Sequence, residues 1–402
     1  MKNILKKFGF LALLLCISLG TCKSPDNNGK GKGNGNGNGN ENGSDIDPFD
    51  ISAMEFVGNM RIGWSLGNTF DATGSGATVE QLEAAWVGTV TTKANIDAVK
   101  NAGFNIIRLP VSWSKVADPD NNYAIRKDWM QRIAQVVNWA IDNDMYVILN
   151  THHDSGETGT IFRFTNDTVE RSLEIFKQIW EQIAENFKWH EEKLIFEPLN
   201  EPRTPSSDWN GTPEKYVNLN RHYQAFVDTV RASGGNNGKR FLLFNTYAAS
   251  AGAAAMNGLV LPADTATDKL IVSYHAYAPY NFCLSTQNSS TDQWSVNGNR
   301  GRDALDITEP MERYYQKFVK NNIPVIIGEF GAMNRNNAAV RGQWAEFYTK
   351  SARDRGMPVV WWDNAITSGS GELFGLLDRR TNQIIYPEVL EGLLKGSEKN
   401  NE

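Results

Sequence analysis

The amino-acid sequence predicts one α/β domain folded as a closed (β/α)8 barrel, the TIM barrel, and two observations carry this prediction. Eight short apolar runs recur between residues 62 and 365, and each ends in polar or aromatic side chains. Stretches with helical periodicity separate these runs. Near-continuous apolar runs indicate strands that are buried on both faces, as in a parallel sheet with crossover helices. Eight such units over about 350 residues favour closure of the sheet into a single barrel.

The expected strands lie, in chain order, at 62–68, 105–113, 146–153, 194–202, 241–247, 270–277, 325–331 and 359–365. Helical periodicity is clear at 92–103, 129–144 and 169–187. Gly103 stands where the first of these helices should end, and glycine suits a helix exit. A doubly wound open sheet is the alternative, but no glycine-rich phosphate turn follows the first strand.

Residues 1–22 are predicted to be an export signal. Three lysines precede an apolar run of about ten residues, which is too short to span a bilayer. The stretch "LGTC" that ends at Cys22 resembles a bacterial lipobox, so a lipid-anchored and a freely secreted protein both remain open. Residues 23–45 are rich in Gly and Asn and predict a disordered linker. The folded domain is expected at 46–396.

Composition excludes several classes of partner. The net charge is −6, with 21% charged and 41% hydrophobic residues, which is ordinary globular usage and gives no reason to expect nucleic acid. Membrane contact is expected only through the N-terminal lipid anchor, and the protein is expected to be a monomer. Cys283 is the only cysteine within the predicted domain, so no disulfide framework is expected. No Cys-His pattern surrounds it, and we interpret it as a spectator thiol.

Polar and aromatic side chains gather at the predicted strand ends, where barrel enzymes place their active sites. These residues are Asn68, Arg108, His152, His153, Asn200, Glu201, His275, Tyr277, Glu329 and Trp362. Among them, Glu201 and Glu329 follow the fourth and seventh strands and should project into one cleft. A glutamate at a strand end is often only a solvated or capping residue. Two of them facing one cleft are the machinery of glycoside hydrolysis, in which one carboxyl donates a proton and the other attacks.

Seven motifs in order resemble glycoside hydrolase family 5. They are "GWSLGNTFDA", "IIRLPVSW", "VILNTHHD", "LIFEPLNEPR", "SYHAYAP", "IIGEFGA" and "WWDN", and the resemblance extends from about residue 50 to 395. The first motif and "LNEPR" most resemble the subfamily 4 endoglucanases and xyloglucanases. The resemblance implies a retaining endo-β-1,4-glucanase that acts on polysaccharide with no cofactor and no metal. Ser65 stands where the family more often has Asn, which bears on substrate breadth.

The resemblance also implies roles for the reacting groups. Glu201 matches the general acid/base and Glu329 matches the nucleophile. Arg108 matches the arginine that keeps the nucleophile charged; alternatively, it pairs with another acid as a structural residue. Tyr277 matches the phenol that donates to the nucleophile, and His275 lies near the acid/base.

Other matching positions are implied to hold the sugar. Asn200 matches the residue that binds the sugar 2-hydroxyl, and His152 and His153 match the pair that binds sugar in the −1 subsite. Trp362 matches the stacking platform beneath the ring. Asn68 is a further candidate for a sugar contact.

Several alternatives remain open at this stage. His152, His153 and Asp154 are also potential metal ligands, with His275 as a further one. Three tryptophans are candidates for outer sugar subsites, namely Trp113, Trp209 and Trp294. Trp361 is expected in the core by strand alternation. A β-mannanase or xylanase on the same fold and a non-catalytic glycan-binding protein are the alternative functions.

Overall fold

The computed structural model describes residues 47–156, 161–204 and 208–398. These residues all belong to one compact unit. The expected export signal at 1–22 and the expected linker at 23–45 lie outside the described residues. Among the residues that are described, no helix has the length and apolar character needed to cross a membrane.

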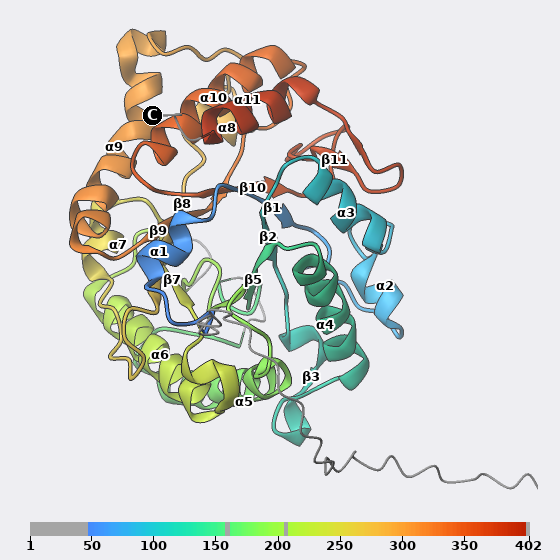
Figure 1. Cartoon of the computed structure of the whole chain (residues 1–402), viewed down its shortest axis with the longest axis vertical. Helices are drawn as coiled ribbons and strands as arrows, with labels where there is room; N and C mark the ends of the chain where they lie inside the picture. Colours follow the sequence, from blue (N-terminus) through green and yellow to red (C-terminus); the bar gives the residue numbers. More distant parts are fainter. Residues whose placement is uncertain (1–46, 157–160, 205–207, 399–402) are drawn as a thin grey trace, which may run out of the picture. The chain divides into compact units, whose positions relative to one another are not determined.

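The expected (β/α)8 barrel is confirmed, as Figure 1 shows with the helices arranged around the ring of strands. The barrel strands are β1 (Ile62–Leu66), β2 (Ile106–Leu109), β5 (Tyr146–Asn150), β6 (Leu194–Glu197), β7 (Leu242–Ser250), β8 (Leu270–His275), β9 (Val325–Phe330) and β10 (Val359–Asp363). They pair in parallel in the order β1-β10-β9-β8-β7-β6-β5-β2, and β2 pairs with β1 to close the ring. Each strand overlaps one of the eight apolar runs.

Helices precede, connect and follow these strands, and most of them lie on the outside of the barrel. They are α1 (Ala53–Gly58), α2 (Val79–Glu83), α3 (Lys93–Asn101), α4 (Lys127–Asp142), α5 (Val169–Phe187), α6 (Pro213–Ala232), α7 (Ala253–Gly258), α8 (Tyr280–Cys283), α9 (Arg302–Lys317), α10 (Ala338–Arg353) and α11 (Pro387–Ser397). Two antiparallel pairs lie in loops, β3 (Ala117–Asp118) with β4 (Ala124–Ile125) and β11 (Leu377–Asp378) with β12 (Gln383–Ile384). A capping box of Thr92 and Asn95 begins α3, which satisfies backbone N–H groups of its first turn.

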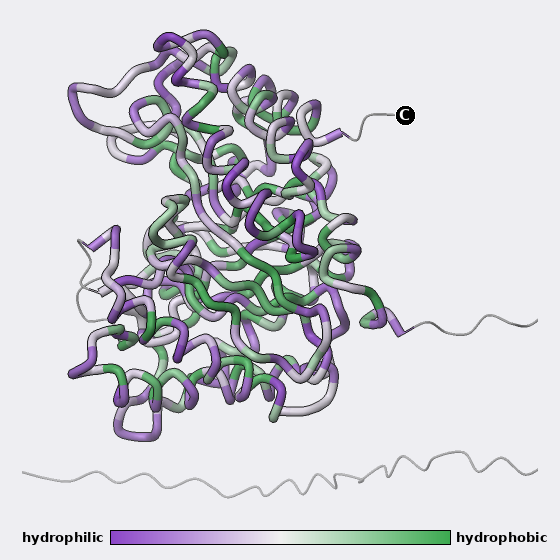
Figure 2. The backbone as a smooth tube through the Cα atoms, turned by 90° about the vertical axis from the view of Figure 1, so that its left-hand side faces the viewer, coloured by the Kyte–Doolittle hydropathy of each residue, from purple (hydrophilic) through white to green (hydrophobic). Residues whose placement is uncertain are grey.

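Strand alternation divides the apolar side chains into an inner and an outer core. In β2, Ile106 belongs to the cluster inside the barrel and Ile107 to the layer between strands and helices. Figure 2 shows the resulting concentration of hydrophobic residues in the central strands. Because the side-chain period is two, the next inward position after Ile106 is Arg108. The same rule places Glu197 inward above Ile195.

The lower end of the barrel is closed by the segment around α1. Phe56 packs with inward residues such as Ile106 and Ile195, and its ring stacks on Phe241 with centroids 3.8 Å apart. In Figure 1, α1 crosses the ring of strands. The apolar closure at this end leaves the ends of the strands that carry Arg108 and Glu197 as the polar mouth of the barrel.

Candidate active site

Two glutamates face each other at this mouth. Glu329 is part of β9, and Glu201 lies four residues beyond the end of β6. One carboxylate oxygen of each, together with a ring nitrogen of His275, lie within 4.8 Å of one another. The side chain of Glu329 is 6% exposed and that of Glu201 is 20% exposed. The sequence prediction that both glutamates reach one cleft is therefore met by their positions.

Glu329 is fixed by two hydrogen bonds. Arg108 Nη1 donates to Glu329 Oε1 over 2.6 Å, and the Tyr277 hydroxyl donates to Glu329 Oε2 over 2.8 Å. Burial, together with the charges of Glu329 and Glu201, raises the pKa of Tyr277 well above its usual value, so the phenol keeps its proton. Each oxygen of Glu329 thus has a donor, and the carboxylate is held in one orientation.

Arg108 is itself held by a second carboxylate. Its Nε and Nη2 donate to the two oxygens of Glu197, both over 2.8 Å, and Nη2 also donates to Asn200 Oδ1 over 2.6 Å. Burial would lower the pKa of Arg108, but the charges of Glu197 and Glu329 outweigh it and raise the pKa. Arg108 therefore pairs with Glu329 and also with a second buried acid, so the two pairings that the sequence left open occur together.

Glu201 has a different set of partners. His275 Nδ1 donates to Glu201 Oε1 over 3.0 Å, and Arg203 Nη1 donates to Glu201 Oε2 over 2.8 Å. Burial raises the pKa of Glu201, but the hydrogen bond from His275 and the charges of His275 and Arg203 outweigh burial and lower it. The guanidinium of Arg203 lies 3.9 Å from the centroid of the Trp209 ring. These partners favour the ionised form of Glu201.

His152 is arranged as a hydrogen-bond donor toward the cleft. Asn150 Oδ1 accepts from the Val111 backbone N–H, which directs Asn150 Nδ2 to donate to His152 Nδ1 over 3.1 Å. Burial, followed by the charges of His153 and Arg108, lowers the pKa of His152 well below its usual value. The neutral ring therefore carries its proton on Nε2, where it can donate to a sugar hydroxyl.

The same arrangement argues against a metal at this histidine pair. A metal-binding histidine normally donates its other ring N–H to an acceptor, but Nδ1 of His152 accepts a hydrogen bond here. The carboxylate of Asp154 already accepts hydrogen bonds from the backbone N–H groups of Trp113 and Ser114. Possible ligand atoms of Asp71, His152 and His153 lie within 4.8 Å of one another, yet Asp71 already accepts from two backbone N–H groups. These hydrogen-bonding side chains suit a ligand with several hydroxyl groups better than a metal cation.

Trp362 and Asn200 complete the mouth of the barrel. The Trp362 ring is parallel to the His152 ring with centroids 5.5 Å apart, and a side chain at Gly67 would come within 2.7 Å of it. Glycine at position 67 therefore allows the tryptophan to lie there. Asn200 Oδ1 is committed to Arg108, which leaves its amide N–H groups as donors. Asn68 is partly exposed at a left-handed turn, and its backbone N–H donates to Asp71.

The tryptophan predictions met mixed outcomes. Trp113 is fully buried, which excludes it from an outer subsite, whereas Trp294 is 7% exposed, about as little as Trp362, so its role stays a prediction. Trp113 was misassigned because loop position alone does not report burial. Trp209 is 50% exposed beside Arg203, as an outer subsite requires. Trp361 is in the core, as strand alternation predicted.

Sequence reasoning also missed three residues of this site. Glu197 braces Arg108, Asn245 Nδ2 donates to Glu197 Oε1 over 2.6 Å, and Arg203 contacts Glu201. Strand alternation above Ile195 could have revealed Glu197 as an inward acid. Arg203 is the last residue of the motif "LNEPR", but no pattern in the sequence indicates that its side chain reaches Glu201.

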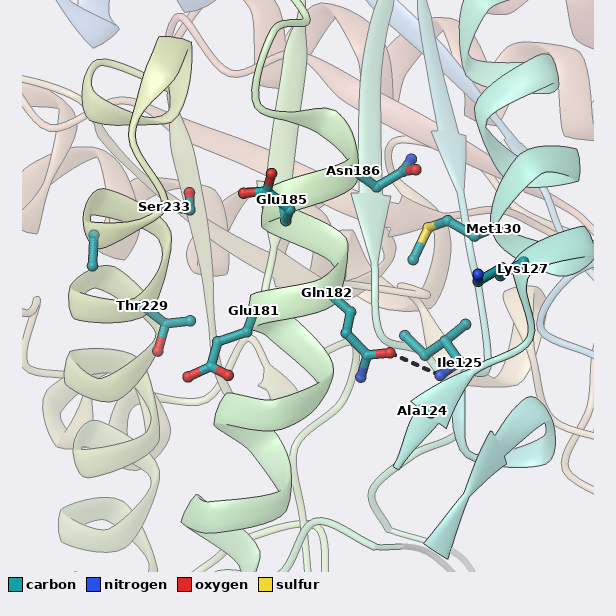
Figure 3. A pocket seen from close by; sticks show the side chains of 11 residues that line it. Ala124, Ile125, Lys127, Met130, Glu181, Gln182, Glu185, Asn186, Thr229 and Ser233 are labelled. Carbon is teal, nitrogen blue, oxygen red and sulfur yellow. Dashed lines mark hydrogen bonds between the residues drawn. The ribbon is translucent and has the colours of Figure 1, made fainter. Parts of the chain in front are cut away.

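A hollow of about 740 Å³ lies elsewhere, between α4, α5 and α6 on the outside of the barrel (Figure 3). Its lining includes Met130, Glu181 and Glu185. These side chains come from the helix layer and not from the strand ends. The chemistry of the chain is concentrated at the mouth, and we place the candidate active site there.

Comparison with known proteins agrees with this geometry. The family model described as Cellulase (glycosyl hydrolase family 5) matches residues 70–368. The chain is 42% identical to Endoglucanase B of Ruminococcus albus over 359 residues, which cover 88% of this chain and 83% of that protein.

Two solved structures are similar to the fold. One is a GH5-4 broad specificity endoglucanase from Ruminococcus champanellensis with bound cellotriose, with a TM-score of 0.81 and 42% identity over 86% of this chain and 99% of that chain. The other is a glycoside hydrolase 5 lichenase from Caldicellulosiruptor sp. F32 in complex with cellotetraose. Its TM-score is 0.81 and its identity 41%, over 87% of this chain and 96% of that chain.

Proposed function

We infer that this chain, which belongs to glycosyl hydrolase family 5, is a retaining endo-β-1,4-glucanase. The observation that supports the mechanism is the close approach of the two carboxylates: His275 Nδ1 lies 3.0 Å from Glu201 Oε1 and 3.5 Å from Glu329 Oε2, and one oxygen of each carboxylate lies within 4.8 Å of the other. Retaining glycosidases hold their carboxyl groups about 5–5.5 Å apart, whereas inverting enzymes need about 6.5–9.5 Å to admit a water molecule. The alternatives of a mannanase, a xylanase or a non-catalytic glycan binder are not favoured, since the relatives are endoglucanases and a lichenase.

In the first step Glu329 acts as the nucleophile. Its carboxylate attacks the anomeric carbon, and the bond from that carbon to the leaving oxygen breaks. Glu201 donates its proton to the leaving oxygen, which departs as the hydroxyl of the released glucan end. Arg108 and Tyr277 hold the attacking carboxylate in line, because each donates to one of its oxygens.

In the second step a water molecule releases the glycosyl group from Glu329. Glu201, now ionised, takes a proton from the water as the oxygen attacks the anomeric carbon. The bond to Glu329 breaks and its carboxylate is restored. Two inversions at one carbon give net retention. Asn200 donates to the sugar 2-hydroxyl, His152 and His153 bind hydroxyls of the same sugar, and Trp362 supports the ring.

The proton on Glu201 must be favoured by the bound substrate. The pKa of Glu201 lies below its usual value because His275 and Arg203 outweigh burial. A sugar chain in the cleft excludes water from this partly exposed carboxyl, and loss of solvation favours the neutral acid. Substrate binding therefore prepares Glu201 for its first role.

The experiment that tests this function follows the product anomer. Purified protein is mixed with a soluble cello-oligosaccharide, and the first reducing ends are observed by NMR before mutarotation. A β-anomer is expected as first product, and an α-anomer would contradict the retaining mechanism. Sized products from carboxymethyl-cellulose should include long fragments at early times, as internal cleavage requires.

We propose that the substrate range covers cellulose-type β-glucans and extends to mixed-linkage glucan or xyloglucan. A similar solved structure is called a lichenase, and another is called a broad specificity endoglucanase. A panel of carboxymethyl-cellulose, lichenan, xyloglucan, mannan and xylan tests this range. Activity confined to mannan or xylan would contradict it.

We also propose that the protein is exported, works as a monomer, and is either secreted or anchored at the cell envelope by a lipid on Cys22. The lysines and apolar run of residues 1–22 support export, and the stretch "LGTC" supports the anchor. Cys22→Ala should move the protein from the membrane fraction to the soluble fraction. Unchanged fractionation would contradict the anchor, and sedimentation of the purified domain tests the monomer.

A further inference from the structure

A second hollow opens on the same face as the catalytic pair. It has a volume of about 640 Å³ and is lined by the loops that follow β8, β9 and β10, at residues 286–292, 333–336 and 369–373. These loops leave the carboxyl ends of their strands, which is the end where Glu201 and Glu329 lie. The volume is in the range of small-molecule sites. We call it the side pocket.

The lining of the side pocket is connected to the nucleophile through one cluster of packed side chains. Met333, which lines the pocket, packs with Trp362 and Phe374, and Tyr277 packs against the same cluster. The Tyr277 hydroxyl donates to Glu329. The pocket therefore lies beside the platform on which a glucan chain would rest.

The charges that act on Glu372 also indicate that the loop following β10 lies close to the reacting groups. Glu372 lies between Gly371 and Leu373, both of which line the side pocket. Partial burial, together with the charges of Glu329 and Glu201, raises the pKa of Glu372. The rim of the pocket therefore lies within the electrostatic range of the catalytic pair.

Some polar side chains of the side pocket have protein partners and others have none: Thr291 Oγ1 forms hydrogen bonds with the backbone of Gln293, and Asn334 Oδ1 accepts from the Asn336 backbone N–H. Within the described part of the chain, the side chains of Ser290, Asp292 and Asn336 make no hydrogen bond, although they line the hollow. Arg335, by contrast, donates from its guanidinium to the carbonyls of Phe282 and Ser285. Hydroxyl, carboxylate and amide groups that lack protein partners suit a ligand with many hydroxyls.

The charge of the lining selects a neutral ligand. Arg335 and Asp292 are the charged residues among the lining side chains, so the lining has no net charge. Met333 and Leu373 supply an apolar wall of the kind that packs against the C–H face of a sugar. A phosphate or a cation would find no matching excess of charge here.

We propose that the side pocket is a subsite for one pyranose unit of the glucan substrate, bound beside the chain that rests on Trp362. This inference rests on the glucanase function proposed above. The pyranose can come from two sources, either the next unit of the main chain or a sugar branch attached to it.

The test fills the pocket and leaves the catalytic groups in place. Ser290→Trp occupies the hollow, and Ser295→Trp is the matched control, because Ser295 lies on the same loop but lines a neighbouring hollow. Hydrolysis of cellohexaose, of xyloglucan and of an activated aryl cellobioside is measured for both. Binding of cellohexaose and of a xyloglucan oligosaccharide is measured by calorimetry with each substitution in a Glu329→Gln background.

Ser290→Trp should raise KM and Kd about tenfold or more on the substrate whose sugar enters the pocket. A loss on both glucans identifies a main-chain unit, and a loss on xyloglucan alone identifies a branch. Equal values for Ser290→Trp and Ser295→Trp on every substrate would overturn the subsite. If Ser290→Trp fails to fold, the double variant Asp292→Ala with Asn336→Ala carries the same comparison.

The experiment distinguishes failure of the proposed glucanase function from failure of the proposed subsite. A parent chain that neither hydrolyses nor binds any glucan would overturn the function and the subsite together. A parent chain that hydrolyses glucans while filling the pocket has no effect would overturn the subsite alone.

Discussion

Glu329 and Glu201 face each other across the mouth of the barrel, but their supports differ in kind. Glu329 is part of strand β9, and its two donors, Arg108 and Tyr277, come from or directly follow barrel strands. Glu201 lies beyond the end of β6, and one of its donors, Arg203, lies in the loop two residues later. One carboxylate is built into the sheet, and the other is held from its edge.

The bracing residues repeat this difference. Arg108 is fully buried and donates two hydrogen bonds to the carboxylate of Glu197 on β6. Arg203 is braced by loop groups, namely the Trp209 ring and the backbone at Gly156, where a Cβ would come within 3.2 Å of it. A nucleophile must stay fixed and charged, whereas an acid/base must exchange a proton with water in each cycle. The structure supplies rigidity to the first and access to the second.

The largest effect should come from removing the nucleophile. Glu329→Gln keeps the size of the side chain and its hydrogen-bonding shape but cannot form the glycosyl-enzyme. Turnover of carboxymethyl-cellulose should fall by about 10⁵-fold or more, because loss of a covalent nucleophile removes the whole two-step route. Circular dichroism and the melting temperature check that the fold is retained. Activity close to that of the parent would contradict the role of Glu329.

Removing the acid/base should cost less and should depend on the leaving group. Glu201→Ala should lower hydrolysis of unactivated glucans by about 10²–10⁴-fold, the usual contribution of general acid catalysis. An activated aryl glycoside needs little protonation, so its first step should be nearly unaffected. Azide should then restore part of the turnover by attacking the glycosyl-enzyme in place of activated water. Equal losses on both substrates would contradict an acid role.

The same contrast explains what sequence could predict. Strand-borne residues follow from period-two alternation and from the rule that barrel sites lie at strand ends, so Arg108 and Glu329 were placed correctly. Glu197 obeys the same alternation and was available to that argument. All eight strands were found because their apolar runs are buried on both faces.

Loop-borne features could not be read in this way. Arg203 reaches Glu201 through a turn in which it packs against Trp209 and Gly156. Trp209 was a candidate for an outer subsite, but nothing in the sequence pairs it with Arg203. Burial of Trp113 depends on its indole donating to the Asn150 carbonyl, a contact 37 positions away in the chain. Tertiary contacts of this kind have no periodic signature.

A third prediction tests the rigid side of the comparison. Glu197→Gln leaves Arg108 with one buried carboxylate in place of two, and breaking a buried ion pair costs about 3 kcal/mol. The free energy of unfolding in urea should fall by about that amount, and turnover should fall by up to about 10²-fold as Glu329 loses its fixed position. Glu185→Gln, at an exposed ion pair with Lys188, is the control and should change neither. Unchanged turnover in Glu197→Gln would show that Arg108 needs no brace.

The smallest effect should be a change of pH dependence at the loop-borne support. The positive charge of Arg203 helps to lower the pKa of Glu201, so Arg203→Met should raise that pKa. The general acid works only when protonated, and its pKa in the free enzyme sets the alkaline limb of kcat/KM. The alkaline limb should therefore move to higher pH in Arg203→Met, while the rate at the optimum changes by less than about tenfold.

Charge and packing can be separated at this position. Arg203→Lys keeps the charge near Glu201 but loses the planar stack on Trp209, and Trp209→Ala removes the stack while keeping the guanidinium. If the charge of Arg203 tunes Glu201, the limb should stay near its original pH in Arg203→Lys and move only in Arg203→Met. If the pKa of Glu201 depends instead on Trp209 holding Arg203 in one orientation, Arg203→Lys and Trp209→Ala should move the alkaline limb as far as Arg203→Met does. A limb that stays in place in all three variants would mean that His275 alone sets the protonation of Glu201, and the loop would then support the carboxyl only sterically.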